Sequence, residues 1–282
     1  MIPYNFHTHS KFSDGACAPE EYVIEAIKQD FKGLGFSEHS VLPFSNTFAL
    51  TERREKEYCT EVARLKEKYK GEIEICLSLE ADFIPGMSES MASLKQRLSL
   101  DYIIGSVHLV RESAASGDLW FIDGPMVQIY DDGINGIYAG DARMAVTAYW
   151  HQVNKMILEE QFDVAGHLDK VKMHNKGRWF SEEDDWYLSL VNETIELIAQ
   201  KGLLVEINTR GLYKKRSDTF FPGDYILRQL FDKGIGIVVS SDAHHPSEIS
   251  LCFDQAINKL KETGYRSSYV FCNNDWQEIA LQ

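Results

Sequence analysis

The sequence predicts an α/β protein in which parallel strands close into a barrel. Short apolar runs alternate along the chain with amphipathic segments of helical spacing, which is the pattern of a parallel sheet with right-handed crossovers. About seven strand-and-helix units fit into the chain, so the barrel should be of the (β/α)8 type with one unit fewer. Polar side chains follow each predicted strand, and in such barrels that end carries the active site.

The first half of the chain contains four predicted strands separated by three predicted helices. Pro19 suits the first turn of a helix, because the N–H that it lacks is not needed there. The second helix is highly charged. The strands are expected at residues 5–9, 33–37, 72–79 and 101–107, and the helices at residues 19–30, 52–69 and 88–98.

Residues 109–140 show no clear period, and we interpret them as an inserted loop that forms a lid. Glycines and a proline interrupt this segment, and such residues favour turns over regular elements. The segment also carries the aromatic residues Trp120, Phe121, Tyr130 and Tyr138. For any single one of them, packing of the lid onto the barrel is the alternative to a contact with a ligand.

The second half of the chain continues the alternation with three further strands of the sheet. Ser181, with Asp184 three residues later, resembles the capping box of a helix. Apolar residues keep strict helical spacing from Ile249 to Leu260. The strands are expected at residues 162–166, 203–207 and 235–240, the helices at 141–161, 181–200 and 249–260, and a short edge strand at 269–272. Without a repeat or linker, residues 1–282 should form a single domain.

The composition argues against several classes of partner. A net charge of −14 disfavours a broad surface for nucleic acid, which would need clustered Lys and Arg. No run of about eighteen apolar residues is present, so we expect no membrane span. The chain starts without a basic and then apolar signal, and its five cysteines are scattered. These features predict a cytoplasmic protein with free thiols.

His7 and His9 are the starting point for a candidate site. They are two residues apart in a predicted strand, so their imidazoles point to the same side. Two neutral imidazoles on a rigid strand form half of a site for a divalent metal, and Asp14 follows after a turn. Two histidines that only bind backbone carbonyls would fit an isolated pair equally well.

Side chains that can bind a metal or an anion follow every predicted strand. In order, they are His7 and His9; Glu38 and His39; Glu80 and Asp82; Ser106 and His108; His167 and Asp169; Glu206, Asn208 and Arg210; Asp242 and His244. Six of the nine histidines lie at these strand ends. Because the strands of a parallel barrel end at the same face, we expect these side chains to gather in one cavity.

A set of motifs spread over nearly the whole chain matches one known family. The motifs are His7-Thr8-His9-Ser10 with Ser13-Asp14-Gly15, Glu38-His39, Glu80, Ser106-Val107-His108, Gly166-His167 and Asp242-Ala243-His244. In this combination they resemble the PHP (polymerase and histidinol phosphatase) family. The stretch from Gly105 to Leu109, with Ile122-Asp123 after it, is similar to the histidinol-phosphate phosphatase branch. The resemblance implies a distorted (β/α)7 barrel and a trinuclear metal centre.

The resemblance also implies which residues bind the three divalent ions. His7, His9, Glu80 and Asp242 would hold the first ion. Glu80 would bridge to a second ion, completed by His108 and His167. Asp14, His39 and His244 would hold the third, although some relatives carry histidine where this chain has Asp14. Imidazole and carboxylate ligands suit zinc, iron or manganese.

The reaction implied by the resemblance is the hydrolysis of L-histidinol phosphate to L-histidinol and phosphate, a step of histidine biosynthesis. A hydroxide bridging two ions would attack phosphorus, because metal binding lowers the pKa of water to about 7. Asp242 or His244 would help the alcohol to leave, and Arg210 would clasp the phosphate. Asn208, Trp120 and Asp123 are further candidates for contacts with this small substrate.

Several alternatives stay open at this point. Arg210 would equally form a salt bridge with a neighbouring loop, and the basic residues 214–216 are interpreted as a solvated loop. The protein would otherwise be a PHP phosphoesterase for nucleotides or short oligonucleotides, or a catalytically silent PHP-like module.

Overall fold

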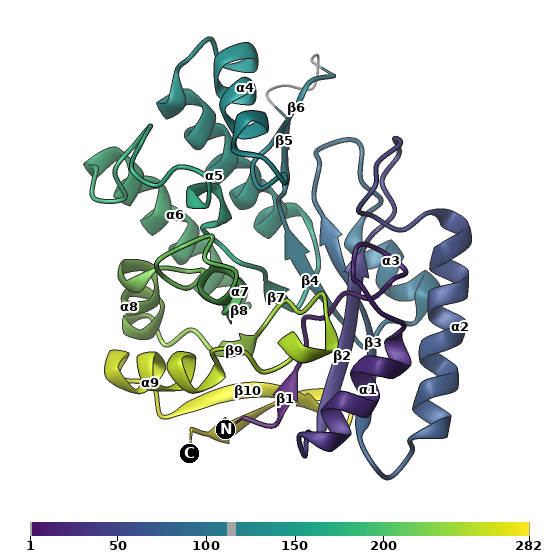
Figure 1. The fold of residues 1–282 in the computed structure, drawn as a ribbon. Helices are drawn as coiled ribbons and strands as arrows, with labels where there is room; N and C mark the ends of the chain where they lie inside the picture. The colour runs from purple at the N-terminus through teal and green to yellow at the C-terminus, as the bar shows by residue number, and fades with distance from the viewer. Residues whose placement is uncertain (1, 112–116, 282) are drawn as a thin grey trace.

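A parallel sheet of seven strands curls into a nearly closed barrel in the computed structural model, which describes residues 2–111 and 117–281 (Figure 1). The strand order is β1 (Tyr4–Asn5), β2 (Gly33–His39), β3 (Glu74–Asp82), β4 (Tyr102–Ser106), β7 (Val164–Ala165), β8 (Leu204–Asn208) and β9 (Ile237–Ser240). All neighbouring strands pair in parallel. The predicted (β/α)7 barrel is therefore confirmed.

The barrel closes just beyond the ends of β1 and β9. The N–H of His9 donates to the carbonyl of Ala243 at 2.8 Å, and the N–H of Ala243 donates to the carbonyl of His7 at 3.1 Å. The predicted strand at residues 5–9 is longer than the observed β1, because side chains replace part of the ladder. The N–H of Thr8, for example, donates to Ser37 Oγ at 3.0 Å. The segment after β1 thus stays extended and fixed without a regular strand.

Helices cover the outside of the sheet. They are α1 (Pro19–Lys28), α2 (Glu52–Lys68), α3 (Met91–Leu98), α5 (Ala142–Glu159), α6 (Asp185–Lys201), α8 (Asp224–Asp232) and α9 (Phe253–Thr263). Hydroxyl or carboxylate groups of Thr51, Ser90 and Asp141 cap three of them. α8 and the short α7 (Arg210–Tyr213) were not predicted, and α6 begins a turn later than predicted. No helix of the described residues is long and apolar enough to span a membrane.

The segment 109–140 is more regular than predicted. Its described part contains the antiparallel strands β5 (Leu109–Arg111) and β6 (Leu119–Phe121) and the helix α4 (Val127–Ile137), whereas residues 112–116 lie outside the description. Trp120 is fully buried, with the ring of Tyr130 tilted against it and the ring of Tyr138 edge-on to it. Gly133 is needed in α4 because a Cβ there would lie 2.0 Å from the Trp120 ring. Gly133 therefore allows close packing, and the prediction of an aperiodic loop is wrong here.

A two-stranded hairpin packs against β9 and against the barrel residues Phe6 and Tyr102. It consists of β10 (Ser267–Cys272) and β11 (Asp275–Ala280), which pair only with each other. Trp276 lies edge-on to Phe6, Tyr102 and Phe271. Figure 1 shows the hairpin below the barrel, far from the β5–β6 segment. The predicted edge strand at 269–272 is thus one arm of a hairpin outside the main sheet.

Candidate metal centre

Glu80, at the carboxyl end of β3, lies at the centre of the histidines that follow the barrel strands. Its Oε2 is 3.3 Å from Nε2 of His7, 3.3 Å from Nε2 of His9 and 3.1 Å from Nδ1 of His39. Its Oε1 is 2.7 Å from Nε2 of His167 and 3.4 Å from Nε2 of His108. One buried carboxylate therefore faces five imidazoles. Three of them lie near Oε2 and the other two near Oε1.

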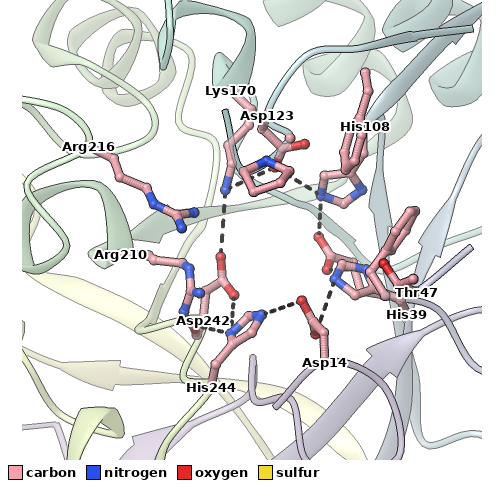
Figure 2. Close-up of a pocket in the computed structure, with 15 residues that line it drawn as sticks. Asp14, His39, Thr47, His108, Asp123, Lys170, Arg210, Arg216, Asp242 and His244 are labelled. Carbon is pink, nitrogen blue, oxygen red and sulfur yellow. Dashed lines mark hydrogen bonds and ion pairs between the residues drawn. The ribbon is translucent and has the colours of Figure 1, made fainter. Parts of the chain in front are cut away.

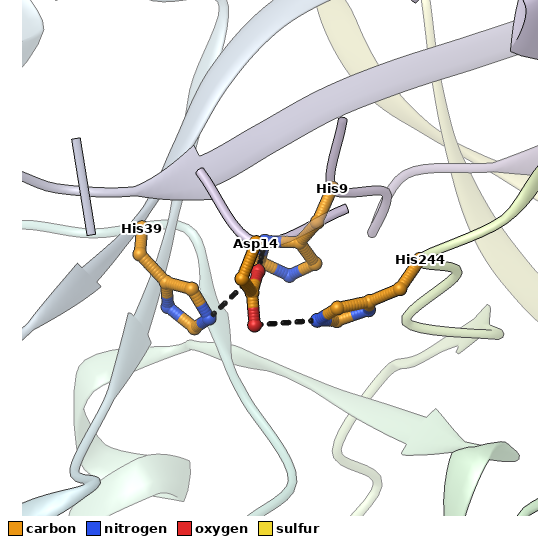
Figure 3. Close-up of side chains that lie close together, drawn as sticks. All are labelled: His9, Asp14, His39 and His244. Carbon is orange, nitrogen blue, oxygen red and sulfur yellow. Dashed lines mark hydrogen bonds and ion pairs between the residues drawn. The ribbon is translucent and has the colours of Figure 1, made fainter. Parts of the chain in front are cut away.

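The nine predicted ligands all lie in this cluster. Three groups place one donor atom per residue within 4.8 Å of one another: His9, Asp14, His39 and His244; His7, His9 and Asp242; His39, Glu80 and His108. Figure 3 shows the first group, in which Asp14 Oδ2 is 3.1 Å from His244 Nε2. His167 completes the cluster, with its Nε2 3.1 Å from that of His108. The groups share residues, so they form one continuous centre.

Hydrogen bonds fix three of the histidines so that their Nε2 atoms face inward. Nδ1 of His7 donates to Glu206 at 2.8 Å, and Nδ1 of His108 donates to Asp82 at 3.2 Å. Nδ1 of His244 donates to the carbonyl of Asp242 at 3.0 Å. In its neutral form, each of these rings then has a lone pair on Nε2, which is the arrangement found around metal-bound histidines.

The spacing of these lone pairs suits a bound cation. Nε2 of His7 and Nε2 of His9 are 3.1 Å apart, a distance at which two lone pairs repel each other unless a proton or a cation lies between them. Two imidazoles on one tetrahedral zinc ion are separated by about 3.3 Å, since each Zn–N bond is about 2.0 Å. The donor set therefore fits divalent metal ions, and carboxylates supply the remaining negative charge.

The charge balance of the cluster supports the same conclusion. Burial lowers the pKa of His9 and of His39 to about 4, so both rings are neutral at pH 7. Burial works against ionisation of Glu80, but His7, His108 and His39 hold its pKa well below the ordinary value. Burial also opposes a proton on His108, yet Asp123 and Glu80 raise its pKa to about 10. A metal ion would replace this proton, because histidine and carboxylate ligands bind metals in deprotonated form. The same carboxylates that stabilise the proton would then stabilise the charge of the ion.

The loop that carries Asp14 is held by a buried carboxylate. Glu38 accepts the N–H of Ser10 at 2.9 Å and the N–H of Ser13 at 3.1 Å, as well as both hydroxyls. Gly15 then passes so close to the first strand segment that a Cβ would lie 2.1 Å from the carbonyl oxygen of His9. Glu38 and Gly15 thus position Asp14 although neither contributes a donor to the cluster.

The cluster opens into a cavity of about 270 Å³. Its walls include the metal-competent residues Asp14, His39, Glu80, His108, Asp242 and His244, and also Thr47, Phe48, Phe121, Asp123, Gly124, Pro125, Lys170, Arg210 and Arg216. Of the predicted substrate contacts, Arg210 and Asp123 line this cavity. One N–H of Arg210 donates to the carbonyl of Asp242 at 2.7 Å, so Arg210 also fixes that residue.

Asn208 and Trp120 do not line the cavity, which corrects two expected contacts with a substrate. The side-chain amide of Asn208 donates to Glu206 at 3.0 Å and to Asp242 at 3.3 Å. Its oxygen accepts the N–H of Arg210, so Asn208 orients neighbouring residues. Trp120 belongs to the core of the β5–β6 segment, where its indole N–H donates to the carbonyl of Tyr130.

Two cationic residues of the cavity were not predicted. Lys170 directly follows Asp169, the last residue that we considered at the end of the fifth strand, and this position was the available signal. Arg216 belongs to the basic residues that we interpreted as a solvated loop, yet it lines the cavity (Figure 2). Sequence spacing could not show that the turn after α7 directs Arg216 toward the cavity.

Comparison with known proteins identifies the fold family. A family model described as the PHP domain matches residues 5–210. The chain belongs to the PHP family. A "Probable histidinol-phosphatase" of Deinococcus radiodurans is 27% identical over 266 residues, which cover 93% of this PHP chain and 94% of that protein. The relationship therefore extends beyond the matched domain to almost the full length of both proteins.

Solved structures share this PHP barrel. A candidate histidinol phosphatase of Listeria monocytogenes superposes with a TM-score of 0.76 at 20% identity, over 89% of this chain and 99% of that one. The histidinol phosphate phosphatase of Lactococcus lactis, solved with zinc, L-histidinol and phosphate, gives a TM-score of 0.68 at 21% identity, over 97% and 98% of the two chains. At these identities, the likeness establishes the common fold.

Proposed function

We propose that this PHP protein is a metal-dependent phosphomonoesterase that hydrolyses L-histidinol phosphate to L-histidinol and phosphate. The observation that carries the proposal is the single carboxylate of Glu80 surrounded by five imidazoles at the floor of a small cavity. The names of the full-length relatives and the ligands of the Lactococcus lactis structure support the choice of substrate.

The donors of the cluster are sufficient for three divalent ions. His7, His9 and Asp242 would hold one ion with Glu80, His108 and His167 a second with the same carboxylate, and Asp14, His39 and His244 a third. Zinc, iron and manganese all accept such ligands. Ions bound there would act as Lewis acids on water and on the phosphoryl oxygens. In the same proposal, Asp242 or His244 would help to supply the proton that the leaving alcohol takes up.

The remaining wall of the cavity suits the other parts of histidinol phosphate. Asp123 is half-buried, and its Oδ1 has no hydrogen-bond partner among the described residues, so it can accept from the ammonium group. Phe48 and Phe121 lie with their ring centres 5.4 Å apart and offer a surface for the imidazole ring. A cavity of about 270 Å³ lies near the lower end of the range for sites that bind small molecules. Long nucleic acids are not part of this proposal.

The cysteines add support for a reducing, cytoplasmic setting. All five are free thiols in the structure, as expected where glutathione keeps thiols reduced. We include this location in the proposal.

Release of inorganic phosphate from L-histidinol phosphate is the direct test. The metal-loaded protein should hydrolyse this ester far faster than a nucleoside 3′,5′-bisphosphate or a short oligonucleotide. The opposite preference would support the nucleotide phosphoesterase instead. Fewer than two bound ions per chain, with no activity on either substrate, would favour a catalytically silent module.

A further inference from the structure

Lys170 is a buried lysine on the wall of the cavity. It begins the short 3₁₀ helix after β7, Lys170–Lys172, and only 3% of its surface is exposed. Lys172, two residues later, is equally buried, but its ammonium group contacts several acceptors. Its Nζ is 2.7 Å from Asp169 Oδ2 and donates to Thr219 Oγ1 at 2.9 Å. The two lysines differ in what their ammonium groups contact.

The ammonium group of Lys170 makes no hydrogen bond to any residue in the described ranges. Its nearest carboxylate oxygens, Asp123 Oδ2 and Asp242 Oδ2, are 3.6 and 3.8 Å away. The ring of Phe221 lies on another side, with its centre 5.3 Å from Nζ. An ammonium group has three N–H donors, and burying them without acceptors is unfavourable. Because Nζ lines the cavity, its donors are available to a molecule that enters.

Two other cationic side chains extend this side of the cavity. Figure 2 shows Lys170, Arg216 and Arg210 along one side, and His108, His39 and Asp14 along the other. An anion between the two sides would meet the donors of Lys170 directly. The protein as a whole carries a net charge of −14, so this arc of cations is a local exception that favours anions.

We propose that Lys170 binds the phosphate group of the substrate and makes the site selective for phosphate monoesters over diesters. The proposal deepens the proposed function, on which it rests. A monoester at neutral pH carries two negative charges and three non-bridging oxygens, whereas a diester carries one charge and two such oxygens. Donors on the side opposite the metal ligands can bond to the third non-bridging oxygen, which only a monoester has. They should therefore bind a monoester more strongly than a diester.

Neutralisation of Asp123 and Asp242 is the competing role for Lys170. A lysine that serves only as a counter-ion is expected to approach its carboxylate closely, as Lys172 approaches Asp169 at 2.7 Å. Lys170 instead stays beyond hydrogen-bonding distance of both carboxylates. The two roles also differ in what a variant would lose, since a counter-ion acts on folding and metal retention.

The experiment compares Lys170→Met and Lys170→Arg with Lys28→Met. Lys28 has a side chain that is 74% exposed on α1, so its variant controls for the loss of one charge. We measure bound metal per chain, the melting temperature, the affinity for inorganic phosphate by calorimetry, and kcat/KM for p-nitrophenyl phosphate and bis-p-nitrophenyl phosphate. Lys170→Gln, which keeps a polar end, takes the place of the Met variant if that variant does not fold.

We expect Lys170→Met to retain its metal and to bind phosphate about 10- to 100-fold more weakly, as for one lost charged hydrogen bond. Its preference for the monoester should fall at least about 10-fold, Lys170→Arg should recover part of both, and Lys28→Met should match the wild type. Unchanged phosphate affinity, or lost metal with an unchanged preference, would overturn the role of Lys170 alone. A wild-type protein that neither binds phosphate nor cleaves either ester would overturn the proposed function as well.

Discussion

Glu80 is the residue whose environment departs most from that of an ordinary buried carboxylate. It contacts the imidazoles of both the first and the second ligand set, and Ser106 donates to the same Oε1 at 2.7 Å. A side chain in this position can connect two cations, which a neutral amide does much less well. The cluster is therefore expected to depend on its charge.

Replacement of Glu80 by Gln should remove both metal and activity. We expect the number of ions per chain to fall and kcat to drop at least about 100-fold, because even residues that only orient metal ligands contribute 10- to 100-fold. Metal analysis of the purified variant and a phosphate-release assay measure the two effects. Glu67→Gln, on the exposed side of α2, is the control. Full metal content in Glu80→Gln would contradict the central role of this carboxylate.

The orientation of a side chain was predictable where the residue follows a local period. It was not predictable where long-range packing places the residue. His7 and His9 follow from the two-residue period of an extended segment, and the structure brings them to a common point. The burial of Trp120 depends instead on Gly133 and Tyr130, which come from a helix that the sequence did not reveal. The direction of a side chain in an irregular segment is set by contacts that no local period encodes.

At the scale of elements, the loop between β1 and α1 has the tightest geometry near the site. Gly15→Ala would place a methyl group against the backbone carbonyl of His9, so the loop with Asp14 would have to move. We expect kcat to fall about 10- to 100-fold, as for a displacement of about 1 Å within a catalytic site. Activity assays with metal analysis would measure this loss.

The matched glycine substitution is Gly136→Ala in α4. A Cβ at Gly136 meets no atom within 4 Å, and alanine is favoured over glycine within a helix by about 0.5–1 kcal/mol. This variant should therefore be as active as the wild type and slightly more stable. Equal activity in the Gly15 and Gly136 variants would show that the loop does not position Asp14.

The strands and most helices were predictable because each has a local signal. The buried strands are apolar runs, and helices such as α2 and α9 keep an amphipathic period. The β5–β6 segment was missed because glycines, which it contains, are also typical of turns. The predicted first strand was longer than β1 because side chains of Asn5 and Ser37 form hydrogen bonds in place of backbone bonds of the sheet. Competing side-chain bonds of this kind cannot be read from hydrophobic periodicity.

For the whole molecule, metal ions are expected to join the ends of strands that are distant in sequence. The candidate ligands run from His7 to His244, and ions that bind only the folded chain stabilise it by about 2.7 kcal/mol at a hundredfold excess over Kd. Removal of the metals by a chelator should therefore lower the melting temperature by roughly 5–10 °C. The Glu80→Gln variant should respond less. Identical melting curves with and without chelator would contradict this coupling.

The whole fold was more predictable than its cavity, since the alternation of strands and helices determines a parallel barrel and the face on which its strand ends meet. The cations Lys170 and Arg216 became apparent only once the segments after β7 and α7 were placed in space. Their contribution distinguishes this pocket from the acidic surface that the net charge alone suggests.

A crystal structure with zinc and phosphate, measured on both sides of the zinc absorption edge, tests the central claim most directly. The account predicts three anomalous peaks among the nine donors, two of them on opposite oxygens of Glu80, each about 2.0–2.2 Å from its ligands. Peaks confined to the protein surface, or no anomalous signal beside Glu80 in protein that is active, would contradict it.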